Sequence, residues 1–257
     1  MGFGAPTSPA STAGADGGLY LRDSSANTIG GKLALGEGNV VSGNAGSGII
    51  MDGPGSSDNV VSGNWIGLGP GVPTVKRSNG RHGILLMGGA SFNTIGGPDG
   101  TFRNVISANG YNGVRITDPS THANLVESNF IGSDAVYSAD ATLGNTWAGI
   151  RINNGAHDNL IGGLQGEGNR ISYNLLSGVE VAGTPPPQDN AVLGNTILEN
   201  TELGIDLGGT NTVSPNDPGD TDSGPNALLD FPELTSGFIA AGQLTLNCGH
   251  GADRGAG

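Results

Sequence analysis

The stretch NTIGG at residues 27–31 returns unchanged at 93–97, and a variant, NLIGG, stands at 159–163. The interval is 66 residues in both steps, from 27 to 93 and from 93 to 159. A fixed interval of this kind is typical of repeat proteins, in which each unit packs on its neighbours instead of around one compact core. The spacing therefore predicts a solenoid.

A second recurring element, glycine followed by an apolar-x-apolar triplet, divides the 66-residue unit into two unlike coils of about 30 residues each. Inside each coil, three short segments alternate apolar and polar residues, as strands do, and turn residues separate them. No segment supports a helix. The element occurs as GLYL at 18, GIIM at 48, GILL at 83, GVRI at 113, GIRI at 149, GVEV at 178 and GIDL at 204.

Sorting the strand residues by alternation places an apolar stripe on one face of each strand, because successive side chains point to opposite faces. Three such stripes along one axis predict an all-β fold, a three-sided parallel β-helix of about seven coils. Representative inward residues of the three strands are Ile150, Ile161 and Ile171.

Asparagine precedes the second strand of the first six coils and also precedes the third strand. Asparagine tolerates left-handed turns and bonds turn backbone, so stacked asparagines predict structural ladders. The paired glycines of NTIGG supply positive φ where the chain leaves the second strand. The NTIGG motif is thus predicted to stabilise the fold and not to take part in catalysis. The two series are Asn27, Asn59, Asn93, Asn124, Asn159 and Asn190, and Asn39, Asn64, Asn104, Asn129, Asn169 and Asn195.

Composition excludes several classes of function. The chain has 257 residues with 49 glycines and few aromatic residues, so small and β-branched residues must form the core. A formal charge of −13 argues against binding to nucleic acid or anionic membranes. One cysteine, Cys248, excludes an internal disulfide framework. We expect a monomer, secreted or at a bacterial cell surface, with its export signal already removed from this chain.

The sequence pattern NTIGG…GNVVSGN…GIIM resembles that of right-handed parallel β-helix repeat proteins of bacteria, the pectate-lyase-like superfamily. The resemblance covers about residues 18–208. It implies a groove of polysaccharide size along one side, and its relatives include lyases, polygalacturonases, epimerases, phage tailspikes and non-catalytic surface proteins. The paired-Asp and Arg-x-Lys segments of polygalacturonases and the Asp-Pro-His segment of alginate epimerases are absent here.

Four segments are expected. A flexible N-terminal segment covers 1–17, the β-helix 18–208, an acidic loop with a C-terminal cap 209–246, and a disordered tail 247–257. Two long insertions, at 68–82 and 133–148, are expected to project as the walls of the groove.

Charged residues concentrate in the last four coils of the outward row of the first strand. Glu180 and Asp206 fall on neighbouring coils, so their carboxylates should lie roughly 5 Å apart, a separation that a retaining glycosidase uses. Like-charge proximity would raise one pKa and provide an acid beside a base. The alternative is that Arg151 pairs with Glu180 on a solvated face and that Asp206 belongs to the end cap.

A polar patch is expected over coils four and five, where His122 and His157 occupy the same turn position. With Arg115 and Arg151 nearby, this patch could bind an acidic sugar, or Arg151 or His157 could act as the base of an elimination. The alternative is ordinary turn histidines. Zinc lacks a third ligand here.

Aromatic residues give a further binding hypothesis. Trp65 and Phe130 share one outward position of the third strand, and Trp147 ends the second insertion. Exposed rings could stack on sugars. Equally, the long loops could cover Trp65 and Phe130 as a satellite core.

Beyond the repeats, Asp217, Asp220 and Asp222 stand among proline, glycine and asparagine. Such a loop offers oxygen ligands for a structural Ca²⁺, and an acidic linker is the alternative. No other cofactor is expected to be required.

Two classes of function remain open after these observations. One is an extracellular enzyme that cleaves glycosidic bonds of a polysaccharide, by hydrolysis or elimination, with Glu180 and Asp206 as catalytic pair and Arg115 and Arg151 holding substrate. The other is a non-catalytic solenoid that binds glycans or serves as an adhesive stalk. An ice-binding surface is disfavoured because Leu160 interrupts the threonine series of Thr28 and Thr94.

Overall fold

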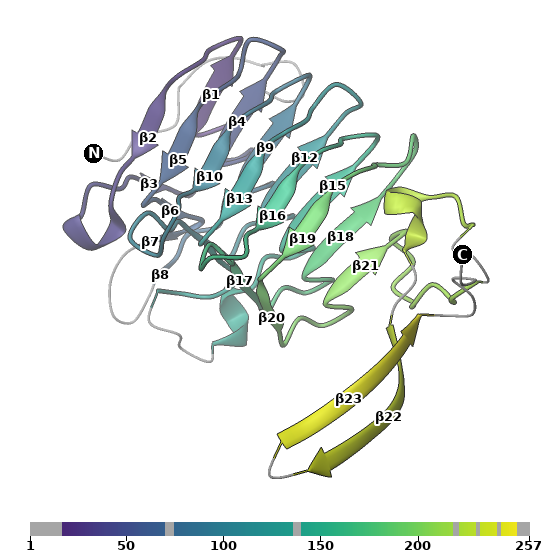
Figure 1. Cartoon of the computed structure of the whole chain (residues 1–257). Helices are drawn as coiled ribbons and strands as arrows, with labels where there is room; N and C mark the ends of the chain where they lie inside the picture. The colour runs from purple at the N-terminus through teal and green to yellow at the C-terminus, as the bar shows by residue number, and fades with distance from the viewer. Residues whose placement is uncertain are drawn as a thin grey trace.

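Three parallel sheets form the solenoid (Figure 1). Each of the first six coils contributes one strand to each sheet, and the seventh adds a strand to one sheet only. The computed structural model describes residues 17–69, 75–135, 140–217, 221–229, 232–240 and 243–250. The alternating pattern of short strands and tight turns thus produces the predicted right-handed parallel β-helix.

We name the sheets A, B and C in chain order. Sheet A holds β1 (Leu19–Arg22), β4 (Ile49–Asp52), β9 (Ile84–Met87), β12 (Val114–Thr117), β15 (Ile150–Asn153), β18 (Val179–Ala182) and β21 (Ile205–Leu207). Sheet B holds β2 (Thr28–Gly30), β5 (Val60–Ser62), β10 (Thr94–Gly96), β13 (Leu125–Glu127), β16 (Leu160–Gly162) and β19 (Ala191–Leu193). Sheet C holds β3 (Val40–Val41), β6 (Trp65–Ile66), β11 (Val105–Ile106), β14 (Phe130–Ile131), β17 (Arg170–Ser172) and β20 (Thr196–Leu198).

The core consists of the three aliphatic stripes, one from each sheet. Ile150, Ile161 and Ile171 are fully buried, as are their equivalents in the middle coils. Neighbouring coils pair in parallel with like residues in register, for example Ile150 with Val179. The assignment of inward and outward faces by alternation is therefore confirmed.

Asparagine ladders hold the turns together along the whole solenoid. In the first ladder, Asn93 donates from both its backbone N–H and its Nδ2 to Oδ1 of Asn124, at 3.1 and 3.0 Å. The second ladder repeats this geometry, as between Asn104 and Asn129. Both predicted ladders are present. In every step the donor belongs to the coil nearer the N-terminus, so the ladders have a direction.

A third ladder, which the sequence analysis did not identify, precedes sheet A. Its side chains bond in the same way, with Asn109 Nδ2 donating to Asn145 Oδ1 at 2.9 Å. The sequence does contain this ladder, because in every coil after the first an asparagine stands four residues before the glycine that opens the first strand. The members are Asn44, Asn79, Asn109, Asn145, Asn174 and Asn200.

The glycines of NTIGG are required by close backbone contact. Gly96 has φ of +106°, and a Cβ there would lie 1.8 Å from the carbonyl oxygen of Glu127 in the next coil. No side chain fits at that distance. The first glycine of the motif thus permits both the left-handed turn and the stacking of coils.

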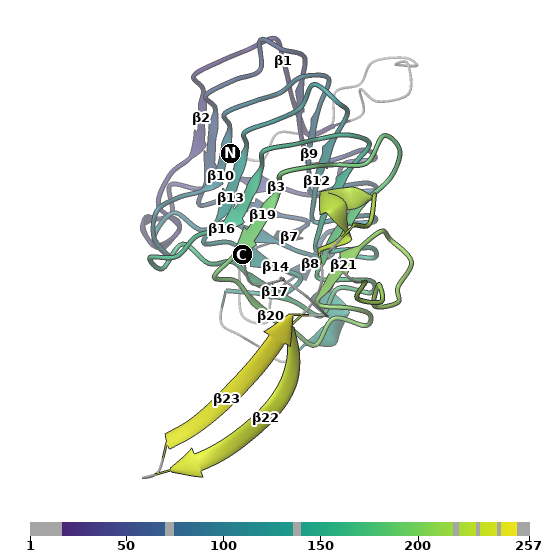
Figure 2. The same cartoon turned by 45° about the vertical axis from the view of Figure 1, so that its right-hand side comes forward.

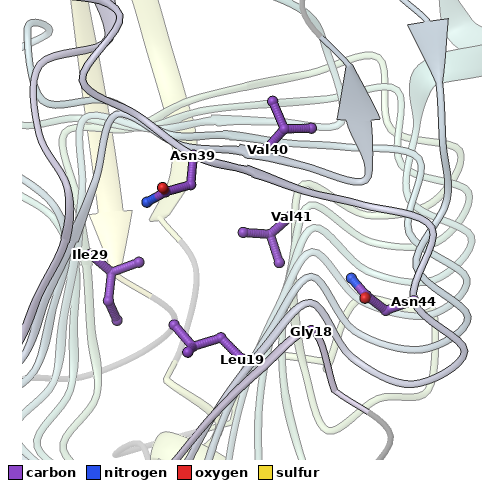
Figure 3. A pocket seen from close by; sticks show the side chains of 7 residues that line it. All are labelled: Gly18, Leu19, Ile29, Asn39, Val40, Val41 and Asn44. Atoms are coloured by element: carbon purple, nitrogen blue, oxygen red, sulfur yellow. The ribbon is translucent and has the colours of Figure 1, made fainter. Parts of the chain in front are cut away.

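The N-terminal end of the solenoid opens into its apolar interior. Figure 3 shows Leu19, Ile29 and Val41 pointing into the space between the three sheets, with Asn39 and Asn44 at the corners. These residues line a small pocket at the first coil. The N-terminal segment 1–16 lies outside the described residues.

At the C-terminal end, the covering residues differ from those expected. Val213, Ser214 and Leu229 lie against Ile205 and Leu207 of the last coil. The strands predicted to form the cap, β22 (Pro232–Ala240) and β23 (Gln243–His250), instead pair with each other as an antiparallel hairpin. This hairpin projects away from the solenoid (Figures 1 and 2), because its strands hydrogen-bond each other rather than the last coil.

The predicted disordered tail also needs correction over its first residues. Asn247 and Cys248 belong to β23, where their backbone pairs with Ser236 and Leu234 of β22. Backbone pairing needs no particular side-chain pattern, so the loss of pattern in the sequence did not reveal it. Residues 251–257 lie outside the described residues.

Two long insertions pack onto sheet C. Leu68, in the short hairpin of β7 (Leu68–Gly69) and β8 (Val75–Lys76), joins Leu143 of the 3₁₀ turn η2 (Ala141–Leu143) in a satellite core. The two insertions also meet where Lys76 Nζ donates to the carbonyl of Thr142 at 3.3 Å. Leu68 and Leu143 thus pack on sheet C instead of projecting, whereas Val75 and Trp147 of the same insertions are exposed, so the groove walls stay a prediction.

Candidate functional site

The outward face of sheet A carries one row of side chains in register from the first coil to the last, beside a second row two residues later that includes Thr117 and Asn153. Charged residues occupy the last four positions of the first row, as the sequence predicted. The row is Tyr20, Ile50, Leu85, Arg115, Arg151, Glu180 and Asp206.

Glu180 and Asp206 are direct partners across β18 and β21. Asp206 is fully buried, and its Oδ1 and Oδ2 accept the backbone N–H groups of Gly209 and Asn211 at 3.1 and 3.0 Å. A Cβ at Gly209 would lie 2.8 Å from Oε1 of Glu180, so the loop after β21 covers both carboxylates. Asp206 therefore holds this loop in place.

The Glu180 carboxylate is 7% exposed and pairs with Arg151, whose Nη2 lies 3.2 Å from Oε1. Burial raises the pKa of Glu180, Arg151 opposes that rise, and the negative charges of Asp206 and Glu202 add to it. A carboxyl with a raised pKa has the property of a general acid. The geometry thus contains the Arg151–Glu180 ion pair, although on a buried rather than a solvated face, and the roles of acid and base stay a prediction.

Arg115 and Arg151 lie side by side on β12 and β15. Arg115 donates from Nε to Asn153 Oδ1 at 3.2 Å, and burial, followed by the charge of Arg151, lowers its pKa. Like charges in directly opposed positions destabilise a sheet unless something else compensates them. The two arginines of the row are balanced in formal charge by Glu180 and Asp206 on the next two coils, and Asp118 also acts on Arg115.

Tyr111 and Trp147 form an exposed aromatic pair beside this face. Their ring centroids are 4.7 Å apart with planes inclined by 29°, and each residue is 38% exposed. Both follow an asparagine of the third ladder by two residues, and Trp147 N–H donates to the Tyr111 carbonyl at 3.2 Å. The sequence analysis singled out Trp147 but missed Tyr111, which occupies the same turn position one coil earlier.

Buried His82 links the aromatic pair to the arginines. Its ring packs edge-on against Tyr111 with centroids 5.4 Å apart. Burial, and to a lesser extent the charges of Arg115, Arg81 and Arg151, lower the pKa of His82 to about 3. Tyr111 and Trp147 lie in the turns that lead into β12 and β15, the strands that carry Arg115 and Arg151.

At the opposite edge of sheet A, His122 and His157 stack in the turns that lead to sheet B. Their ring centroids are 5.2 Å apart and their planes differ by 7°. No hydrogen bond or ion pair in the described part of the chain joins His157 to Glu180 or Asp206. In the same part of the chain, no hydrogen bond or ion pair joins either histidine to Arg115 or Arg151, so the joint patch stays a prediction.

Trp65 and Phe130 belong to the satellite core. Phe130 is 3% exposed and packs with Leu68 and Leu143, and the guanidinium carbon of Arg103 lies 4.3 Å from its ring centroid. The structure therefore corrects the expectation that Phe130 binds substrate, because the insertions cover its ring. Trp65 is half-buried against the same cluster.

The acidic loop gathers no metal ligands among its described members. Asp217 accepts hydrogen bonds from Thr221, with Oγ1 at 2.6 Å. Asp220 lies outside the described residues, and Asp222 is half-buried. Within the described ranges, no group of three or more His, Cys, Asp or Glu residues is placed to hold a metal ion.

A family model described as "Periplasmic copper-binding protein (NosD)" matches residues 10–170, more than half of the chain. This chain belongs to the NosD family. The family is one of right-handed parallel β-helices, and its description as periplasmic agrees with a place in the cell envelope. No curated protein and no solved structure matches the chain significantly. Within its described residues, no helix is long and apolar enough to cross a membrane.

The copper in the NosD description can be tested against the donors present. Imidazole nitrogen and sulfur suit copper better than the carboxylates and backbone groups that dominate this surface. Among the described side chains, only His122 and His157 place two such donors next to each other at the surface. These two rings are stacked, and no third His, Cys, Asp or Glu in the described ranges is placed to complete a site, so the donors present do not fit a copper centre.

Proposed function

We propose that this NosD-family chain binds polysaccharide in the cell envelope on the outward face of sheet A. The observation that supports this most directly is the Tyr111–Trp147 pair, two stacked rings that are each 38% exposed. Other aromatic side chains are exposed too, Phe92 among them, but Tyr111 and Trp147 are stacked on each other and present one continuous surface. Rings of this kind pack against the C–H faces of sugars and fix their position.

Arg115 and Arg151 supply the polar half of the proposed contact. Both are partly exposed, and among the described residues Arg151 has one ion-pair partner, Glu180. Guanidinium groups donate several hydrogen bonds in a fixed plane, which suits sugar hydroxyls and carboxylates. Two guanidinium groups on adjacent coils can also pair with carboxylates of an acidic polysaccharide, which a neutral one lacks.

The test is binding to a panel of neutral and acidic polysaccharides, measured by affinity electrophoresis. Trp147→Ala should weaken binding at least about tenfold, because packing of a buried aromatic ring is worth more than about 1.4 kcal/mol. Phe92→Ala is the matched control, since this ring is also exposed but lies at the other edge of the sheet. Absence of binding to every polysaccharide, or equal losses in both variants, would refute the proposal.

Cleavage of the bound glycan is a second candidate, favoured by one observation. Glu180, with its raised pKa, lies directly beside Asp206, the arrangement of an acid next to a carboxylate. The loop at Gly209 to Asn211 stands over this pair, so cleavage would require the loop to move.

Release of reducing or unsaturated ends separates binding from cleavage. If Glu180 is the general acid, Glu180→Gln should lower turnover at least ~100-fold while the fold remains intact. Arg151→Ala should mainly weaken substrate binding. Full turnover in both Glu180→Gln and Asp206→Asn would exclude this pair, and glycan binding without any product would leave the non-catalytic function.

A further inference from the structure

A column of turn residues runs along the edge of the solenoid where the chain passes from sheet C to sheet A. Backbone hydrogen bonds place its members in line: Tyr111 N–H donates to the Arg81 carbonyl at 2.9 Å, and Trp147 N–H donates to the Tyr111 carbonyl at 3.2 Å. Leu176 and Glu202 continue the column through the same kind of bond, at 3.4 and 3.5 Å. The exposed aromatic pair is therefore the middle of a longer column, with a cation before it and an acid at its end.

Arg81 is exposed and lies one coil before the aromatic pair. In the part of the chain that the structure describes, no salt bridge joins Arg81 to a carboxylate. Arg151, by contrast, pairs with Glu180. The charge of Asp118 likewise acts on Arg115. Arg81 is thus the cation beside the aromatic pair whose charge is left for a ligand.

Charge is distributed unevenly along the chain. Residues 171–250 contain ten Asp and Glu residues and no Lys or Arg. Residues 76–103 contain four Lys and Arg residues and one acid, Asp99. An anionic ligand on the aromatic pair is therefore repelled by the coils that follow the pair and attracted by the coils that precede it. This difference favours one direction of extension, toward Arg81.

We propose that the glycan of this site is anionic and extends from Trp147 over Tyr111 onto Arg81, which binds one of its carboxylates. The inference rests on the proposed function. Coils repeat every ~4.8 Å, close to the advance of an extended glycan per sugar, so a sugar stacked on Tyr111 places its neighbour at Arg81. A guanidinium group binds a carboxylate through two parallel hydrogen bonds, which a neutral sugar cannot accept in the same way. Arg81 therefore determines the preference for an acidic glycan.

Affinity electrophoresis of the full chain in two pairs of polymers tests this preference. Each pair shares a backbone and differs in charge: polygalacturonate with its methyl ester, and carboxymethylcellulose with hydroxyethylcellulose. The parent chain should bind the acidic member of at least one pair more tightly than the neutral member, and added salt should remove the difference. Arg81→Gln should weaken binding to that acidic polymer about three- to fivefold, the upper range for one exposed ion pair. Binding to the neutral counterpart should not change.

Arg22→Gln is the matched control, because it removes the same charge from an exposed residue of sheet A in the first coil, away from the aromatic pair. It should change neither affinity. The inference is overturned if the parent does not distinguish acidic from neutral polymers, if Arg81→Gln has no effect, or if Arg22→Gln causes an equal loss. In each of these cases Trp147→Ala would still weaken binding to both polymers. No binding to any polymer, or parental binding in Trp147→Ala, would instead refute the proposed function and this inference with it.

Discussion

Asp206 lies opposite Glu180 on the next coil and is fully buried, with each carboxylate oxygen accepting a backbone N–H group of the loop that follows. Glu180 instead pairs with an arginine side chain. The two carboxylates therefore have different structural roles, and substitutions should separate them.

Asp206→Asn should lower the free energy of unfolding by about 1–3 kcal/mol. Asparagine keeps one acceptor oxygen, so one of the two loop N–H groups would face an amide nitrogen. Glu180→Gln should cost less, because burial already disfavours the charge of Glu180 and glutamine retains the shape. Urea denaturation of both variants measures the difference, and a larger loss in Glu180→Gln would contradict the assigned roles.

Asn124→Ala should be strongly destabilising, by about 3 kcal/mol or more. Its side chain donates to the carbonyls of Ala90 and His122 and accepts two hydrogen bonds from Asn93, all in a nearly water-free turn. Asn27→Ala is the control, since Asn27 is half-buried in the first coil and water can replace its side chain. We expect a loss there of only about 1 kcal/mol. Equal melting temperatures of the two variants would mean that the ladder contributes little.

Ile150→Asp should cost several kcal/mol, because it places an unpaired charge inside the continuous aliphatic stack. Thr28→Asp, at an exposed position of β2, should be nearly neutral. Thermal unfolding compares them directly. A fold that tolerates both equally would not have the core described above.

His82 should make the fold sensitive to mild acid. The pKa of His82 is lowered from 6.5 to about 3 in the folded chain, chiefly by burial. Above pH 6.5 the ring is neutral in both states and costs nothing. As pH falls below 6.5, the unfolded chain takes up a proton that the folded chain resists, so stability decreases, by about 2 kcal/mol at pH 5.

The matched variant for this pH effect is His82→Asn. Asparagine is already found at the equivalent position of the following coil, where Asn112 stands. Its unfolding free energy should fall less than that of the parent between pH 7 and 5. Parallel pH profiles for the two proteins would show that His82 is protonated without strain.

Much of the fold could be predicted because the repeat imposes it. Glu180 and Asp206 were placed side by side from the coil spacing alone, and the inward position of Ile150 followed from alternation. Regular backbone hydrogen bonding between coils leaves few other arrangements for residues in register.

The remaining features depend on segments that do not repeat. The sequence shows how long the insertions are but not on which sheet they pack. Leu68 and Leu143 pack on sheet C. Likewise, the loop that covers Glu180 is fixed by hydrogen bonds from Gly209 and Asn211, which no periodicity describes. Tyr111 was not predicted because Trp147, its stacking partner, was assigned to an insertion. The two residues occupy the same turn position in neighbouring coils.

The direction of the asparagine ladders has a consequence for how such a chain can change in length. Every coil presents amide donors to the coil after it and amide oxygens to the coil before it, as Asn93 and Asn124 do. The asparagine ladders therefore make the same hydrogen bonds at each junction between two coils. Recombination that duplicates or deletes a 66-residue pair, such as the one from Asn93 to Asn159, would rejoin donor to acceptor without a new interface. Copies of a surface feature such as the histidine pair could then be gained or lost as whole units.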